Sequence, residues 1–214
     1  MSEGLFRAVA TIKLVCFDLG GVLVRINHDW QSASRQAGVP IQLPETSRTG
    51  FTQYTPFVNY QAGLISEDEY AQELSELLGC APDEAKRIHD AILIDEYPGV
   101  PELIQDLKAN GFAACCLSNT NHRHWEALMD ADQFPSLAHL DKALASHLIG
   151  INKPDADAFR SVEAAFPDVE SILFFDDAIA NVDAAIELGW EALRIDPDRN
   201  PVDQMRRRLG VHFG

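Results

Sequence analysis

The sequence predicts an α/β protein with a doubly wound parallel sheet and an inserted helical subdomain. Short apolar runs of strand type recur along the chain, and helical patterns separate most of them. One long stretch after the first run has helical spacing and no convincing strand. With 214 residues, 46% of them hydrophobic, the chain can bury a sizeable core. We therefore predict a core domain over residues 1–26 and 99–214 and a cap subdomain over residues 27–98.

The predicted strands are short and rich in apolar residues, as buried strands of a parallel sheet are. They cover Leu14–Phe17, Phe112–Leu117, Ala143–Leu148, Ile172–Phe175 and Glu191–Ile195. Parallel strands need long crossover connections, and helical signals lie between most of these runs. The predicted helices run from Pro101 to Asn110-Gly111, from Lys153-Pro154 to about Phe166, from Ile179 to Leu188, and onward from Pro201.

The inserted subdomain carries its own helix signals. Ser66 and Glu69 have the spacing of a capping box for a helix that ends near Gly79, and Pro82 starts the next helix. Four aromatic residues at three-residue steps are interpreted as helix packing: Phe51, Tyr54, Phe57 and Tyr60. The stretch Pro40–Gly50 is predicted to be a loop able to move over a site.

Composition excludes several classes of partner. The chain has 17 basic and 33 acidic residues, so its net charge of −16 repels polyanions, and we predict no nucleic-acid partner. The basic cluster Arg206–Arg208 is interpreted as a solvated helix face. No segment approaches the roughly 18 apolar residues that span a bilayer, and Met1–Lys13 lacks the apolar stretch of a signal peptide. We therefore predict no membrane contact and a cytoplasmic location.

Cysteine and histidine residues give no sign of a metal centre. The four cysteines lack metal-ligand spacing and are predicted to be reduced thiols. The seven histidines, including His122 and His124, are interpreted as surface or supporting groups because no spacing makes them ligands.

Asp18 is the first candidate functional residue. It ends the first apolar run and is followed by Gly20 and Gly21. An acid at the carboxyl end of a parallel strand lies in the crevice where open α/β sheets bind ligands, beside N–H groups that glycines leave uncovered.

Three later segments also place polar side chains at strand ends or helix starts. Ser118 and Asn119 follow the second run, and a hydroxyl with exposed N–H groups suits a phosphate oxygen. Lys153 precedes a helix, where a cation opposes the helix dipole and needs a negative neighbour. Asp176 and Asp177 follow the fourth run, and adjacent carboxylates become favourable where a hard cation such as Mg²⁺ binds. Together with Asp18 these groups form a phosphoryl-transfer constellation.

The order and spacing of these motifs resemble the haloacid dehalogenase superfamily of hydrolases over nearly the whole chain. The matching motifs are Phe17-Asp18-Leu19-Gly20-Gly21-Val22, Leu117-Ser118-Asn119-Thr120, Lys153-Pro154, and Phe175-Asp176-Asp177 with Asn181. Ser118-Asn119-Thr120-Asn121, Gly63-x-Ile65-Ser66 and Asp176-Asp177 also resemble bacterial sugar-phosphate phosphatases that act on α-glucose 1-phosphate, and the phosphatase domain of soluble epoxide hydrolase. The resemblance implies a Rossmann-like core with a cap and Mg²⁺-dependent hydrolysis of a small phosphate ester.

The resemblance also implies a catalytic role for each matching residue. Asp18 would attack phosphorus to form an aspartyl-phosphate, which water then hydrolyses. Ser118 and the backbone N–H of Asn119 would hold a phosphoryl oxygen, and Lys153 would offset the charge on Asp18 and the phosphate. Gly20 and Gly21 complete the predicted phosphate-binding set.

The implied metal ligands are the Asp18 and Asp177 carboxylates and the backbone carbonyl of Gly20. Asp176 and Asn181 would orient these ligands. The implied cofactor is Mg²⁺.

Two departures from the family pattern concern catalysis and substrate choice. Phosphatases of the superfamily usually carry a second aspartate two residues after the nucleophile as general acid, and here that position is Gly20. Its absence predicts slow turnover or a leaving group that needs little protonation, such as the anomeric oxygen of a sugar 1-phosphate. In the cap, the related pattern Glu-Arg-Gly-Glu-Ile-Ser reads Gln61-Ala62-Gly63-Leu64-Ile65-Ser66. Candidates for substrate contact are Tyr54, Tyr60, Gln61 and Trp125.

Two alternatives remain open beside the predicted sugar-phosphate phosphatase. In a haloacid dehalogenase Asp18 would attack carbon and no metal would be needed, although paired carboxylates have no use there. A catalytically weak phosphate-binding or interaction protein would fit Gly20 and the altered cap.

Overall fold

The computed structural model describes residues 14–43 and 50–210. A five-stranded sheet forms its centre, with the strand order β5-β4-β1-β6-β7 and every neighbouring pair parallel. The strands are β1 (Leu14–Phe17), β4 (Ala113–Ser118), β5 (Lys142–Ala145), β6 (Ile172–Asp176) and β7 (Glu191–Arg194). This confirms the α/β class and the parallel sheet that the alternating pattern predicted.

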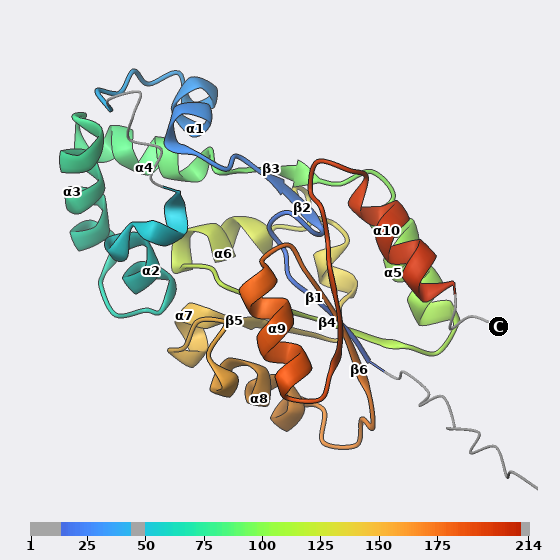
Figure 1. Ribbon diagram of the computed structural model, residues 1–214. Coiled ribbons are helices and arrows are strands. Elements are labelled where there is room, and N and C mark those ends of the chain that lie inside the picture. The colour runs from blue at the N-terminus through green and yellow to red at the C-terminus, as the bar shows by residue number, and fades with distance from the viewer. Residues whose placement is uncertain (1–13, 44–49, 211–214) are drawn as a thin grey trace, which may run out of the picture.

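Side-chain alternation along β1 divides the core between the two faces of the sheet. Val15 and Phe17 pack with the apolar sides of α5 (Val100–Ala109) and α10 (Pro201–Leu209). Leu14 and Cys16 point to the opposite face. That face is covered by α8 (Ala156–Ala165) and α9 (Ile179–Glu187). Figure 1 shows these two helix pairs on either side of the sheet, which is the doubly wound arrangement.

Between β2 and β3 the described residues form four α-helices, which pack around a second hydrophobic core. They are α1 (Trp30–Ala37), α2 (Thr55–Gln61), α3 (Glu67–Leu78) and α4 (Pro82–Asp90). Ser66 accepts a hydrogen bond from Glu69 N and the Glu69 carboxylate accepts one from Ser66 N, so the predicted capping box forms. Trp30 lies at the centre of this core, in edge contact with Phe51 and Phe57. These helices lie together at one end of the sheet (Figure 1).

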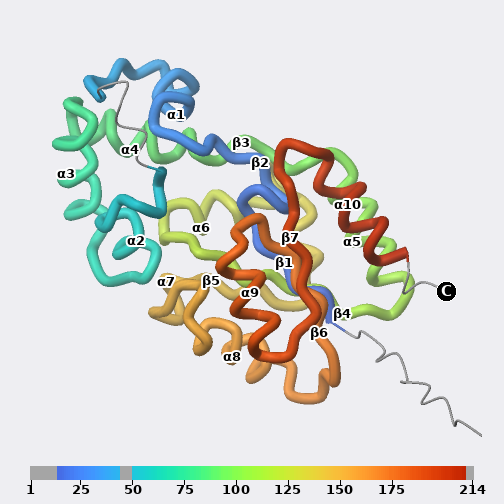
Figure 2. The backbone as a smooth tube through the Cα atoms, in the orientation of Figure 1, coloured from blue at the N-terminus to red at the C-terminus, as the bar shows by residue number. Residues whose placement is uncertain are grey.

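A short antiparallel ribbon joins the helical insertion to the core. It pairs β2 (Val24–Ile26) with β3 (Leu93–Glu96), and Figure 2 shows the two strands side by side where the chain passes between the two units. The expectation of no strand between Asn27 and Pro98 is therefore wrong. The polar composition of β3 hid it: Asp95 pairs with Arg25 across the ribbon, and Glu96 accepts hydrogen bonds from the N–H and hydroxyl of Ser136.

The predicted strand Ala143–Leu148 is only half right. The strand ends at Ala145, and Ser146 begins the short helix α7 (Ser146–Ile149). Gly150 adopts a left-handed φ of 78° and its N–H bonds to Ser146 O at 2.7 Å, which closes the helical turn. The exposed side chain of Leu148 has no strand partner to favour the extended state.

The remaining described elements complete the connections, and two of the three C-terminal arginines form ion pairs. Helix α6 (His122–Leu128) follows β4, and single 3₁₀ turns cover Phe51–Gln53 and Leu137–His139. Arg206 pairs with Asp106 and Arg208 with Glu191. None of the helices within these described ranges has the length and apolar character needed to cross a membrane. Of the predicted loop Pro40–Gly50, residues 44–49 lie outside the described part of the chain.

Candidate functional site

The parallel register brings the ends of three neighbouring strands to one level. Phe17 pairs with Cys116 of β4 and with Phe175 of β6. Asp18, one residue further, is therefore level with the ends of both neighbours, where Ser118 and Asp176 lie. A cavity of about 380 Å³ opens at this edge. Its polar wall contains most of the predicted site residues: Asp18, Gly20, Ser118, Asn119, Lys153, Asp177 and Asn181.

Lys153 is a buried cation held between two carboxylates. Its ammonium donates to Asp18 Oδ1 at 2.9 Å and to Asp176 Oδ2 at 2.7 Å, and its side chain is 1% exposed. Burial alone lowers the pKa of Lys153, but Asp176 and Asp18 outweigh burial and hold the pKa above its ordinary value. Lys153 therefore remains charged. Asp18 and Asp176 are the negative neighbours that a cation placed before a helix needs.

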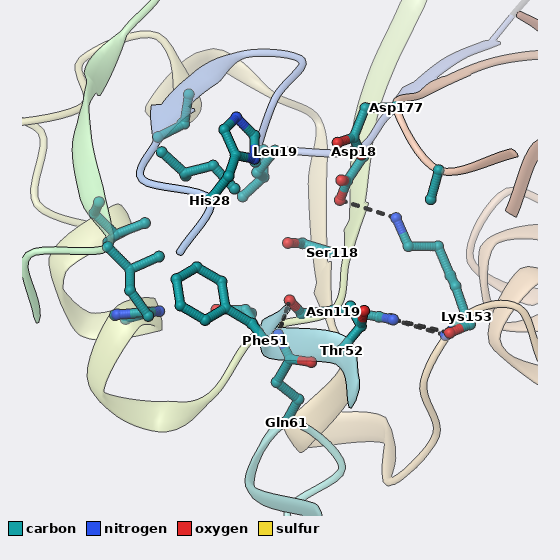
Figure 3. A pocket seen from close by; sticks show the side chains of 18 of the residues that line it. Asp18, Leu19, His28, Phe51, Thr52, Gln61, Ser118, Asn119, Lys153 and Asp177 are labelled. Atoms are coloured by element: carbon teal, nitrogen blue, oxygen red, sulfur yellow. Dashed lines mark hydrogen bonds and ion pairs between the residues drawn. The ribbon is translucent and has the colours of Figure 1, made fainter. Parts of the chain in front are cut away.

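The amide of Asn119 fixes the backbone of Lys153. Asn119 Oδ1 accepts from Lys153 N at 2.8 Å, and Asn119 Nδ2 donates to Lys153 O at 2.9 Å. Figure 3 shows this pair below the Lys153 side chain, which extends to Asp18. Sequence reasoning assigned only the backbone of Asn119, because nothing in a single sequence pairs a side chain with a backbone 34 residues away.

The three aspartates differ in how fully they are hydrogen-bonded. Both oxygens of Asp176 have partners: Lys153, the Asn181 amide at 3.0 Å from each oxygen, and Ala178 N at 2.8 Å. The Asp18 carboxylate accepts a hydrogen bond from Lys153, and its side chain is 14% exposed. Asp177 lies beside Asp18 in the cavity wall (Figure 3). Asp18 and Asp177 thus retain oxygens that can face a ligand.

The electrostatics of this cluster fit a divalent cation. Asp18, Asp176 and Asp177 each offer an oxygen, and these oxygens all lie within 4.8 Å of one another. Burial raises the pKa of Asp18 to about 7; Lys153 opposes this rise, while Asp176 and Asp177 add to it. Burial and then Asp176 raise the pKa of Asp177 as well. One lysine therefore leaves negative charge uncompensated, and hard carboxylate oxygens are the donors that Mg²⁺ prefers.

The two glycines after Asp18 lie close to other side chains. Gly21 has a φ of +77°, and a Cβ there would lie 2.9 Å from Asp177 Oδ2. The Gly21 N–H donates to Val24 O at 2.8 Å and the residue does not line the cavity, so it has no free donor for a phosphate oxygen. Gly20 does line the cavity, and a Cβ there would lie 3.1 Å from Cδ1 of Ile26.

The rest of the cavity wall comes from the cap, the ribbon and α6. Of the four predicted substrate contacts, only Gln61 lines the cavity. Its Nε2 donates to Asn119 O at 2.8 Å. Phe51 and Thr52 lie near Gln61 in the view of Figure 3. The wall also includes His28, which the sequence reasoning did not single out.

Buried histidines support the back of the site. The rings of His89 and His124 stack at 3.9 Å, and both contact Asn121. His124 Nε2 donates to His89 O at 2.7 Å. Burial lowers the pKa of His124 to about 4, so its ring is neutral. This agrees with the interpretation of His124 as a supporting group.

Curated relatives of this chain include two phosphatases. A phosphatase of Mycobacterium tuberculosis is 30% identical over 93% of this chain and 94% of its own length. The D-ribitol-5-phosphate phosphatase of Bacteroides thetaiotaomicron is 26% identical over 86% of this chain and 91% of its own length.

Solved structures of HAD family proteins have folds similar to that of this chain. A predicted HAD-like family hydrolase from Porphyromonas gingivalis has a TM-score of 0.77 and 28% identity, covering 94% of this chain and 98% of its own. A HAD family enzyme from Bacteroides thetaiotaomicron, solved with magnesium and inorganic phosphate, has a TM-score of 0.68 and 23% identity over 87% of this chain and 95% of its own.

The sequence profile of the haloacid dehalogenase-like hydrolases matches residues 12–189, which include every motif from Asp18 to Asn181. The chain therefore belongs to the haloacid dehalogenase-like hydrolases.

Proposed function

We propose that the protein is a Mg²⁺-dependent phosphatase that hydrolyses a small phosphomonoester through a phosphorylated Asp18. One observation carries this proposal: Lys153 neutralises part of a three-carboxylate cluster in which Asp18 and Asp177 keep oxygens free. A site that binds a phosphate ester and a divalent cation together needs groups of both signs. A positively charged side chain such as Lys153 attracts the phosphate, and uncompensated carboxylates beside it bind the metal ion. The magnesium and phosphate reported in a structurally similar HAD family enzyme support the same assignment.

The proposed reaction assigns one task to each residue. Asp18 attacks phosphorus, the ester oxygen leaves, and water then hydrolyses the aspartyl-phosphate. Ser118 Oγ and the N–H of Asn119 bind phosphoryl oxygens, and Lys153 offsets their charge. Asp176 holds the Lys153 ammonium in place.

Mg²⁺ would be held by the Asp18 and Asp177 carboxylates and the backbone carbonyl of Gly20. Bound there, it supplies electrostatic stabilisation of the charge on the transferring phosphoryl group. Asn181 acts indirectly, because its amide donates to both oxygens of Asp176 and fixes the orientation of that carboxylate.

We further propose that the cap, over residues 27–98, closes the cavity and selects a sugar or sugar-alcohol phosphate. A relative that acts on D-ribitol 5-phosphate supports this substrate class. Within the cap, Thr52 and Gln61 offer polar atoms at the cavity wall, while Phe51 and Phe57 exclude water.

A substrate panel tests the proposal. Sugar phosphates, ribitol 5-phosphate and p-nitrophenyl phosphate are assayed with and without Mg²⁺, beside 2-haloacids. We expect phosphate release that requires Mg²⁺ and stops in Asp18→Asn, whose fold should be unchanged by circular dichroism. Halide release without metal would assign a dehalogenase, and full activity of Asp18→Asn would refute the nucleophile. No release of either product would favour a phosphate-binding protein.

A further inference from the structure

Five ionisable side chains line the cavity in the described part of the chain, and His28 is the one without a task. The five are Asp18, His28, His124, Lys153 and Asp177. Asp18 and Lys153 form an ion pair, Asp177 belongs to the carboxylate cluster, and His124 is a neutral buried ring. His28 is exposed at the cavity wall. Figure 3 shows its ring on the side of Asp18 opposite to Lys153.

Gly20 has no side chain that can donate a proton to a leaving group, and the chain near it brings Ile26 and His28 to the cavity. The side chain of Ile26 covers Gly20, since its Cδ1 lies 3.1 Å from the place where a Cβ would begin. His28 follows two residues later, just beyond the end of β2. Both residues line the cavity. The ribbon thus closes the space above Gly20 with an apolar group and places an imidazole next to it.

The His28 ring also lies near Asp177. Burial and Asp176 raise the pKa of Asp177, and Lys153 and His28 both oppose this rise. The His28 ring is therefore close enough to Asp177 for their charges to attract when the ring is protonated. Asp29, the next residue, also interacts electrostatically with His28.

We propose that His28 is the general acid that protonates the leaving group. As Asp18 attacks, the bond between phosphorus and the ester oxygen breaks, and the imidazolium of His28 transfers its proton to that oxygen. The neutral ring then takes a proton from the water that hydrolyses the aspartyl-phosphate, which restores the imidazolium and the Asp18 carboxylate. This proposal rests on the proposed phosphatase activity and assigns to His28 the role usually taken by an aspartate at position 20.

The test compares esters whose leaving groups differ in basicity. The value of kcat/KM is measured for p-nitrophenyl phosphate, for phenyl phosphate and for the primary-alcohol phosphate that the wild type hydrolyses fastest. This quantity reports the steps up to departure of the leaving group, so hydrolysis of the intermediate does not affect it. The variants are His28→Ala, His28→Gln and, as control, His139→Ala, an exposed histidine outside the cavity.

We expect His28→Ala to lower kcat/KM roughly 10²- to 10⁴-fold for the alcohol phosphate and less than about 10-fold for p-nitrophenyl phosphate. Phenyl phosphate should lie between them, since protonation matters more for a more basic leaving oxygen. His28→Gln should not restore the rate, because an amide donates a hydrogen bond but no proton, whereas added imidazole should restore part of it in His28→Ala. His139→Ala should match the wild type.

Two outcomes would overturn the proposal. Equal losses for all three esters would assign His28 to substrate binding or to structure, and no loss in His28→Ala would remove it from the reaction. Both results leave the phosphatase proposal intact, provided that the wild type is active. A wild type that releases no phosphate from any ester would refute the phosphatase proposal itself.

Discussion

Single residues in this site act through charge balance. Lys153 is nearly inaccessible to water and bonded to two carboxylates, so its removal would leave buried charge without compensation. Breaking a buried ion pair by removing one partner is strongly destabilising, because the remaining charge cannot be solvated.

Lys153→Met should therefore lower both stability and activity. We expect the free energy of unfolding to fall by about 3–5 kcal/mol, as is typical for a broken buried pair. Phosphate release should be lost. Urea unfolding measures the first effect, and Lys142→Met, which removes an exposed lysine, serves as control. An unchanged unfolding midpoint in Lys153→Met would contradict the buried pair.

Gly21→Ala should weaken metal binding specifically. Its φ of +77° costs an L-residue about 1–2 kcal/mol, and its Cβ would lie 2.9 Å from Asp177 Oδ2. Gly111→Ala is a matched control, because Gly111 has a φ of +78° and no atom within 4 Å of the new Cβ. Both variants should lose similar stability, but only Gly21→Ala should bind Mg²⁺ more weakly by calorimetry. Equal Mg²⁺ affinities would show that Asp177 does not depend on Gly21.

At this scale the sequence predicted most of the polar wall of the cavity. Asp18, Ser118 and Asp176 end strands that neighbour one another, so the topology alone brings them together. His28 could not be predicted, because its place depends on how β2 pairs with a strand about 70 residues later. The Asn119 amide was missed because its partner is the Lys153 backbone.

At the scale of elements, helix α7 joins the cap to the core. Ser146 Oγ accepts from Thr120 N at 2.9 Å and lies 2.6 Å from Gln61 O, to which it can donate. Asn152 Nδ2 adds a second hydrogen bond, to Val58 O at 3.0 Å. The end of β4, the start of α7 and the end of α2 therefore meet at one buried hydroxyl.

Ser146→Ala should loosen this junction. The buried Thr120 N–H would lose its acceptor, which costs about 1–3 kcal/mol. Faster amide hydrogen exchange at Thr120 would report the change, beside a lower unfolding midpoint. Ser161→Ala, whose hydroxyl bonds to Ala158 O within its own helix, is the control. Protection of Thr120 equal to that in the wild type would mean that another group satisfies it.

The elements also show what limited the prediction. Helices whose start and end signals lie in the local sequence, such as α3 and α5, were predicted closely. Strand β3 was missed because its carboxylates have partners far along the chain, Arg25 and Ser136. Hydrogen-bond and ion-pair partners that lie far apart in the sequence cannot be predicted from a local residue pattern.

At the scale of the whole molecule, excess negative charge links metal binding to pH. In the metal-free protein Asp18 keeps its proton up to about pH 7, whereas in the unfolded chain an aspartate loses it near a pKa of about 3.9. Between these values the folded state binds more protons, so this residue's contribution to the free energy of unfolding falls as pH rises and is smallest above pH 7. Mg²⁺ must displace that proton when it binds below this pH.

The increase in melting temperature caused by Mg²⁺ should therefore be larger about one pH unit above 7 than about one unit below it. Differential scanning fluorimetry with and without Mg²⁺ at the two pH values measures this difference. Asp18→Asn should lose most of the dependence, since its amide does not titrate. Equal stabilisation at both pH values in the wild type would contradict the raised pKa of Asp18.

Both passages of the chain between core and cap run through the ribbon of β2 and β3. Backbone hydrogen bonds extend the ribbon at its core end, because Gly21 N donates to Val24 O, and Tyr97 N donates to Leu23 O. These bonds resist sliding and twisting of the two strands, so we expect a movement of the cap to bend the chain beyond Ile26. Ile26, which belongs to β2, then stays over Gly20 while helices α1–α4 rotate. Opening of the cap to admit substrate would thus move the part of the cavity wall that the cap helices form. Ile26 would keep its place over Gly20, next to Asp18.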